Sequence, residues 1–341
     1  MTRIGVQNRA RKAAAVVGLC ILVGITLARA ARAGELASTV IKFVDEPIVT
    51  RVESHAQDEL WYVSTRHLEL SDLEPTALPR VRVLRRDKKA WDKSSIETLV
   101  GDTNPAKTTL FYFHGNRVSV GYAIESGSLI YQQVRDAIPW EGPLRFVIWS
   151  WPSDRICGQL RDFRVKAMRA DVDALFLAGV LNRMPRQVPV SILAYSFGAR
   201  IVTGGLHLQG GGELLGNKLR RENVNSMRPV RTVFCAAAVH QDWLYFGGKQ
   251  NRACSQMNKF LVLYNSLDPL LMHYRYLEKN SQPAAMGFAG LEQGRLADQS
   301  VVFHQRDVRD QVGLSHSESR YFSSTELVRQ VSQYLQWKKA Q

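Results

Sequence analysis

A short apolar run that ends in a serine corner constrains the fold of this chain more than any other segment. Residues 188–193 are rich in β-branched side chains, as in a strand buried on both faces, and 199–206 read as a helix. Between them lies Ala194-Tyr195-Ser196-Phe197-Gly198. A strand, sharp turn and helix of this kind hold a serine in a strained corner, with its hydroxyl exposed at the start of the helix. Ser196 is therefore a candidate nucleophile, although small-x-Ser-x-Gly sequences also occur in ordinary turns.

A second apolar run, 109–113, stops at His114-Gly115-Asn116 and precedes a helix-like segment, 122–137. Serine hydrolases of this architecture place a backbone N–H donor for the oxyanion hole in such a loop. We therefore expect the N–H groups of Asn116 and of Phe197 to be the two donors. His114 is expected to brace the loop through its ring rather than to act as a base.

The rest of the chain alternates between strand-like and helix-like segments. Strands are predicted at 60–65, 80–84, 144–149, 230–239, 260–264 and 300–303, and helices at 94–100, 162–181 and 325–337. This alternation predicts an α/β fold with a mostly parallel central sheet and helices on both faces. In helix 162–181 the spacing predicts a buried stripe of Val165, Met168, Val172, Leu175, Phe176 and Val180.

An acid and a histidine follow the serine at the ends of later strands. Asp268 stands after strand 260–264, where Pro269 forces a turn, and His316 lies in the polar loop beyond strand 300–303. The order Ser196, Asp268, His316 is characteristic of one fold. A serine hydroxyl needs an imidazole to remove its proton, and the imidazole needs a carboxylate to fix its tautomer. The alternatives are Asp242 as the acid and, as the histidine, His304, His240 or His273.

Five motifs in this order carry a family resemblance. They are LFYFHGN, VIWSWPSD, ILAYSFGAR, YNSLDPLL and GLSHSESRYF. Residues from about 58 to 338 resemble the alpha/beta-hydrolase superfamily, and are most similar to a bacterial branch of uncharacterised function with a WPS motif. The resemblance implies an alpha/beta-hydrolase fold with Ser196 as nucleophile, Asp268 as acid, His316 as base, and Asn116 and Phe197 as oxyanion donors. Ala194 in place of Gly, and Tyr195 where this branch often has His, depart from the pattern.

Residues 1–33 do not belong to the predicted hydrolase domain, 58–341, and 34–57 read as a lead-in segment. A basic start is followed by an uncharged apolar run of 15 residues, 13–27, and by Ala31-Arg32-Ala33. This pattern predicts a secretory signal peptide, and hence export to a periplasmic or extracellular location. The alternative is an uncleaved N-terminal anchor that associates the protein with a membrane.

Charge and cysteine content exclude several other classes. The chain has 45 basic and 31 acidic residues; six of the basic ones lie in 1–33, so the remainder has 39 and a net charge of +8. The basic residues are scattered, as on solvated faces, and we expect no nucleic-acid partner. Cys157, Cys235 and Cys254 have no zinc-site spacing, although a Cys235–Cys254 bridge stays open in an oxidising compartment. We expect neither a cofactor nor a metal.

The sequence thus predicts a serine hydrolase for a small ester or acyl substrate, with a carboxylic ester favoured over a thioester or amide. The Trp149-Ser150-Trp151-Pro152 turn either shapes the wall of the acyl pocket or packs in the core. A peptidase is a weaker alternative. A catalytically silent alpha/beta-hydrolase scaffold that binds a partner in the cell envelope is the alternative from another class, because fold does not guarantee activity.

Overall fold

A computed structural model of the chain describes residues 55–72, 79–87, 90–219, 230–276 and 283–337. The predicted signal or anchor segment, 1–33, lies outside the described residues, as does the lead-in segment except for 55–57. All described residues belong to one compact unit, Ile48–Gln341. Within these ranges the structure has no helix that combines the length and the apolar character needed to cross a membrane.

A nine-stranded sheet forms the centre of this unit, in the order β3-β2-β1-β5-β4-β6-β7-β8-β9. All neighbouring strands from β1 to β9 are parallel, and the antiparallel pairs β1–β2 and β2–β3 add a meander at one edge. The strands are β1 (Glu59–Ser64), β2 (Arg82–Asp87), β3 (Ala90–Ser94), β4 (Thr108–Phe113), β5 (Leu144–Ser150), β6 (Val190–Tyr195), β7 (Val230–Cys235), β8 (Met257–Tyr264) and β9 (Val302–Asp307). The mostly parallel sheet agrees with the fold class predicted from the sequence.

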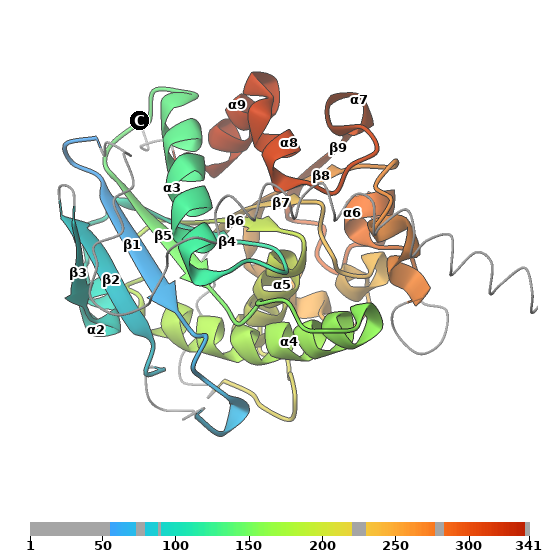
Figure 1. Cartoon of the computed structure of the whole chain (residues 1–341), viewed down its shortest axis with the longest axis horizontal. Coiled ribbons are helices and arrows are strands. Elements are labelled where there is room, and N and C mark those ends of the chain that lie inside the picture. The colour runs from blue at the N-terminus through green and yellow to red at the C-terminus, as the bar shows by residue number, and fades with distance from the viewer. Residues whose placement is uncertain (1–54, 73–78, 88–89, 220–229, 277–282, 338–341) are drawn as a thin grey trace, which may run out of the picture. The chain divides into compact units, whose positions relative to one another are not determined.

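Helices cover both faces of the sheet. In Figure 1, α3, α8 and α9 lie on one face, and α2, α4 and α5 lie on the other. The bounds of the helices are α2 (Ile96–Gly101), α3 (Val120–Asp136), α4 (Gln159–Arg183), α5 (Phe197–Gln209), α6 (Met286–Ala289), α7 (Arg309–Val312), α8 (Glu318–Ser323) and α9 (Thr325–Leu335). Short 3-10 segments at Leu70–Asp72, Gln241–Leu244, Asn251–Gln256, Leu271–Tyr276 and Gln293–Arg295 connect them.

Burial explains why the central strands read as continuous apolar runs. Every residue of β4 and of β6 is buried, because helices pack on both faces. Aromatic rings of neighbouring strands meet there: the Phe113 ring centroid lies 5.4 Å from that of Trp149. At the sheet edge, by contrast, β9 has a single buried residue, Phe303. The centre of the sheet, which ends in the serine corner, therefore lies in the buried core of the fold.

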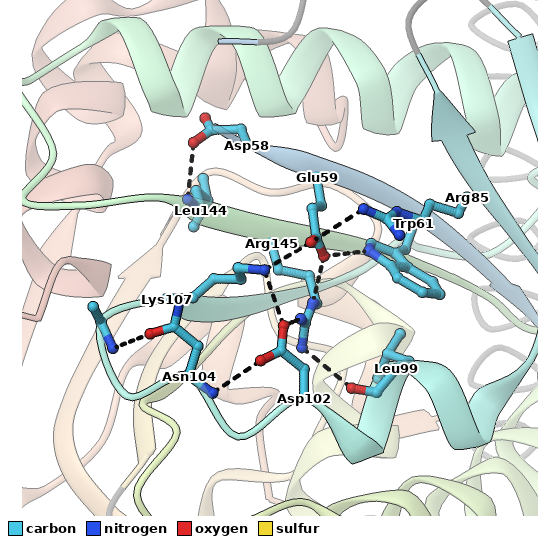
Figure 2. A network of polar contacts seen from close by, with 11 residues as sticks. Asp58, Glu59, Trp61, Arg85, Leu99, Asp102, Asn104, Lys107, Leu144 and Arg145 are labelled. Carbon is cyan, nitrogen blue, oxygen red and sulfur yellow. Dashed lines mark hydrogen bonds and ion pairs between the residues drawn. The ribbon is translucent and has the colours of Figure 1, made fainter. Parts of the chain in front are cut away.

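An ionic network joins the amino ends of β1, β4 and β5 (Figure 2). The serine lies at the opposite, carboxyl ends of the strands. Lys107 Nζ lies 2.7 Å from Glu59 Oε1 and 2.9 Å from Asp102 Oδ2. Arg145 Nε donates to Glu59 Oε2 at 2.8 Å, and its terminal nitrogens donate to Asp102 and to the Leu99 carbonyl of α2. The network thus fixes α2 and three strands to one another, on the side of the sheet away from the candidate site.

Two local predictions were wrong. Met168 is 65% exposed rather than part of the buried stripe of α4. The buried face of the first turns instead includes the charged pair Asp162 and Lys166, which compensate each other and so occupy positions that hydrophobic spacing cannot indicate. The strand predicted at 230–239 ends at Cys235, because Ala236 adopts a left-handed conformation with φ of 48°.

Candidate active site

Ser196 stands at the corner between β6 and α5. Its backbone has φ 52° and ψ −119°, a region that residues with a side chain rarely adopt. Backbone hydrogen bonds to the next strand end hold it there: Ser196 N–H donates to Cys235 O at 3.0 Å, and Ala238 N–H donates to Ser196 O at 3.1 Å. Local strain of this kind persists only where the surroundings enforce it, and it gathers at functional sites. The strand-to-helix turn has the form of a nucleophile elbow.

Small residues beside Ser196 allow backbones to pass close to the corner. A Cβ on Gly198 would lie 2.5 Å from the Phe113 carbonyl oxygen of β4. A Cβ on Gly115 would lie 2.9 Å from the Tyr195 ring and 3.3 Å from Ser196 Cβ. The loop after β4 therefore lies against the serine, as the sequence predicts. Ala194 is fully buried near the end of β6, which accommodates its methyl group.

The structure brings Ser196, His316 and Asp268 together. Ser196 Oγ lies 3.0 Å from His316 Nε2, and His316 Nδ1 lies 2.6 Å from Asp268 Oδ2. A carboxylate can only accept a hydrogen bond, so Nδ1 carries the proton in neutral His316. Nε2 is then free to accept the Ser196 hydroxyl proton. The three groups form a continuous relay from a buried carboxylate to a serine hydroxyl.

Asp268 and the histidine loop are held from β8. Asp268 is fully buried, and its Oδ1 accepts hydrogen bonds at 2.9 Å from the backbone N–H groups of Leu270 and Leu271. The buried Asn265 side chain donates to the carbonyl oxygens of Gly313 and Ser315, at 2.8 and 3.2 Å. Asn265 therefore ties the loop that carries His316 to the end of the strand that carries the acid. The sequence analysis missed this contact.

Tyr195 packs against the histidine. Its ring centroid lies 5.5 Å from that of His316 and 5.9 Å from that of Tyr321 in α8. Burial raises the pKa of both tyrosines well above its usual value, so the hydroxyls stay neutral. Tyr195 thus places an aromatic wall beside the imidazole.

The two predicted oxyanion donors come from different segments. Phe197 is the first residue of α5, and Asn116 lies in the loop between β4 and α3. Within the described ranges no acceptor is found for the backbone N–H of either residue. Both groups can therefore donate to a substrate oxygen.

His114 supports this loop from inside the core. It is fully buried, its Nδ1 lies 2.9 Å from the Gly115 carbonyl oxygen, and its ring stacks on Trp151 at 6.0 Å. Trp151 in turn donates from Nε1 to the His114 carbonyl oxygen at 2.9 Å. Burial, together with the charge of Arg66, lowers the pKa of His114 to about 3. A neutral, buried ring of this kind suits the bracing role and not that of a general base.

The end of β5 and the residues after it, 149–153 and here called the WPS turn, pack in the core. Trp149 and Trp151 are both fully buried, and Trp149 Nε1 donates to Asp173 Oδ1 at 2.5 Å. Burial raises the pKa of Asp173 to about 7, against the effect of hydrogen bonds from Thr65 and Trp149. Of the two roles that the sequence left open for these tryptophans, the structure favours core packing.

The alternative acid and histidines lie in other contacts. Asp242 is in the 3-10 segment Gln241–Leu244, whereas the carboxylate that contacts His316 is that of Asp268. The ring of His304 in β9 contacts the Tyr334 hydroxyl, His240 Nδ1 lies 2.9 Å from Pro283 O, and His273 Nδ1 lies 3.1 Å from Pro269 O.

Cysteine and metal chemistry find no site in the described part of the chain. Cys157, Cys235 and Cys254 are all free, so the Cys235–Cys254 bridge left open above is not formed. Burial raises the pKa of the Cys235 and Cys254 thiols, which keeps them unreactive. No cluster of three or more His, Cys, Asp or Glu residues among the described positions is placed to hold a metal ion.

Comparison with known proteins places the chain at a distance from them. No family model matches it, and no curated protein matches it. Fifteen solved chains match. The catalytic core domain of acetyl xylan esterase from Trichoderma reesei is 13% identical, with 66% of this chain and 98% of that chain covered and a TM-score of 0.33. An inhibited esterase B from Lactobacillus rhamnosis is 12% identical, with 93% and 96% covered and a TM-score of 0.38.

These similarities are too weak to carry an argument, so the classification follows from the molecule itself. The parallel sheet, the helices on its two faces and the serine corner between β6 and α5 define an alpha/beta-hydrolase-like fold. A serine, a histidine and an aspartate meet in hydrogen-bonding distance where the parallel strands end.

Proposed function

We propose that this protein is a serine hydrolase that cleaves a carboxylic ester through an acyl-enzyme intermediate. The observation that supports it best is the relay of Asp268, His316 and Ser196, with 2.6 Å and 3.0 Å between its polar atoms, at a strained elbow. Two features of the relay separate it from a chance contact. The acid is fully buried and accepts hydrogen bonds from two backbone N–H groups, and the serine backbone is held in a conformation of high energy.

In the proposed reaction His316 Nε2 removes the proton of Ser196 as Oγ attacks the ester carbonyl carbon. The negative charge that develops on the carbonyl oxygen is stabilised by the N–H groups of Asn116 and Phe197. Asp268 holds His316 in the required tautomer and stabilises its positive charge. His316 then gives its proton to the departing alkoxide, and the acyl group stays on Ser196.

Water completes the cycle in the second half of the reaction. His316 removes a proton from a water molecule, which attacks the acyl carbon of the acyl-enzyme. The tetrahedral intermediate collapses, Ser196 Oγ takes the proton back from His316, and the carboxylic acid leaves. Thioesters and amides follow the same steps, but the amide nitrogen is a poorer leaving group than the alkoxide of an ester, so an amide is the harder substrate. We favour the ester for that reason.

Export is part of the proposal, since an apolar run that follows basic residues, 13–27, predicts a signal peptide or an anchor. N-terminal sequencing of the protein isolated from its native compartment tests it. A start near Gly34 supports a cleaved signal peptide, a start at the first residues in the membrane fraction supports an anchor, and a cytoplasmic location contradicts both.

Turnover of p-nitrophenyl acetate and butyrate by the full chain tests the activity. Ser196→Ala and His316→Ala should each lower kcat/KM by roughly 10⁴-fold or more, as in other serine triads. His304→Ala is the matched control, because it removes the rival histidine in β9 and should leave turnover close to that of the parent. A folded parent chain without turnover would favour the silent scaffold instead, and turnover of peptides but not of esters would favour a peptidase.

A further inference from the structure

Asp162 is a buried carboxylate that the catalytic relay does not use. It lies in the first turn of α4 with its side chain fully buried. Its Oδ2 accepts hydrogen bonds from Asn116 Nδ2 at 3.1 Å and from Arg117 Nε at 2.8 Å. Its Oδ1 accepts from the backbone N–H of Ile156 at 3.2 Å and lies 3.7 Å from Lys166 Nζ. A buried charge with this many partners joins the segments from which those partners come.

The segment that Asp162 holds is the loop of the proposed oxyanion donor. Asn116 and Arg117 are consecutive, and both side chains end on the same carboxylate oxygen. Arg117 has φ of 61°, a left-handed conformation that is unfavourable for a residue with a side chain. Its backbone N–H donates to Ser153 O at 2.8 Å, which seats the loop on the WPS turn. The loop is therefore kept in an unfavourable turn by contacts from outside it.

We propose that Asp162 is a positioning residue for the oxyanion hole: it holds Asn116 and Arg117 so that the backbone N–H of Asn116 is aimed at the substrate oxygen. The proposal rests on the hydrolase function proposed above. The side chain of Asn116 and the residue after it are both fixed to α4, so the peptide group of Asn116 has little freedom to rotate. Asp162 does not itself touch the substrate, and its effect reaches the reaction through the direction of one N–H group.

Asp173 offers a matched control on the same helix. It is as buried as Asp162, and its carboxylate accepts hydrogen bonds from Trp149 Nε1 at 2.5 Å and Thr65 Oγ1 at 2.6 Å. Both partners belong to the core beside β1 and β5, and neither is in the oxyanion loop. If Asp162→Asn loses activity and Asp173→Asn does not, the loss is therefore specific to the oxyanion loop.

The experiment compares the parent, Asp162→Asn and Asp173→Asn as full chains. Active sites are counted by fluorophosphonate titration, and kcat and KM for p-nitrophenyl butyrate are expressed per active site. The inhibition constant of a trifluoromethyl ketone, which forms a tetrahedral oxyanion on the serine, is measured in parallel. Asp162→Asn should lower kcat by about 10- to 100-fold and should weaken binding of the ketone by a similar factor, with little change in KM. The reason is that only the tetrahedral state needs the correctly oriented N–H of Asn116.

The outcomes distinguish failure of the positioning role from failure of the proposed hydrolase function. A parent chain that neither labels nor turns over removes the proposed function, and the positioning role with it. A parent that is active while Asp162→Asn matches Asp173→Asn in kcat and in ketone affinity overturns the positioning role alone. If Asp162→Asn fails to fold, Asn116→Ala takes its place as the test variant. It keeps the backbone N–H of residue 116 and the ion pairs of Asp162, and it should weaken binding of the ketone more than it changes KM. Unchanged ketone affinity in Asn116→Ala then refutes the proposal.

Discussion

Removing the charge of Glu59 from the network in Figure 2 should make the stability of the protein less dependent on acidic pH. Glu59 lies at the start of β1, with its side chain 13% exposed. Burial alone would raise its pKa, but hydrogen bonds from Lys107, Arg145 and Trp61 outweigh burial and lower the pKa from 4.5 to about 2. The ionised carboxylate is therefore stabilised in the folded state.

The size of the effect follows from the shift in pKa. A change of one pKa unit corresponds to about 1.4 kcal/mol, so the shift of Glu59 is worth about 3 kcal/mol of folding free energy. Because the folded-state pKa lies below the unfolded value, this contribution is fully present above pH 4.5 and is lost as the pH falls towards 2. Glu59→Gln has a neutral side chain of the same shape, and it should behave as protonated Glu59 does at every pH.

Urea denaturation at pH 7, 4, 3 and 2.5 measures the free energy of unfolding. Glu59→Gln should be less stable than the parent by about 3 kcal/mol at pH 7, and the gap should close as the pH falls. Glu97→Gln is the matched control, because Glu97 is an exposed glutamate in the neighbouring helix α2. A gap that stays constant from pH 7 to 2.5, or an equal loss in Glu97→Gln, would refute the reasoning.

Three further predictions concern the surroundings of the serine. Gly198→Ala should lower the unfolding free energy by about 1–3 kcal/mol and cut turnover, since its Cβ would lie 2.5 Å from a carbonyl oxygen of β4; unaltered denaturation curves and rates would contradict this. Asp268→Asn should lower kcat for p-nitrophenyl esters by about 10⁴-fold while Asp242→Asn leaves it near the parent value, and the reverse result would exchange their roles. Burial raises the pKa of Glu318 to about 7, so its charge costs stability at higher pH; Glu318→Gln should raise the unfolding free energy more at pH 8 than at pH 4, and an equal change at both would count against it.

Apolar runs made the central strands predictable. Strands β4, β5 and β6 are buried on both faces, so every residue in them is selected for the core and the sequence shows an unbroken signal. The edge strand β3 was not predicted, because its sequence, AWDKS, has two charged residues among five and none of its side chains is buried. The order of the strands in the sheet could not be predicted from the sequence either, since it depends on pairing between distant segments.

The candidate site was predictable to the extent that its residues stand at strand ends. Ser196, Asp268 and His316 each follow a strand, and chain order alone suggested the set that the structure brings within hydrogen-bonding distance. Asp162 and Asn265 gave no such signal. Each acts through tertiary contacts with a loop that is distant in sequence, and a single buried polar residue in a sequence looks like a surface residue.

Mass spectrometry of the chain after treatment with a fluorophosphonate tests the central claim most directly. We predict one covalent adduct, located on Ser196 in the digested protein, formed readily by the parent and by His304→Ala and much more slowly by His316→Ala. Ser196→Ala should form no adduct. A folded parent that gains no mass, or an adduct located on another residue, would contradict the account of Ser196 as an activated nucleophile.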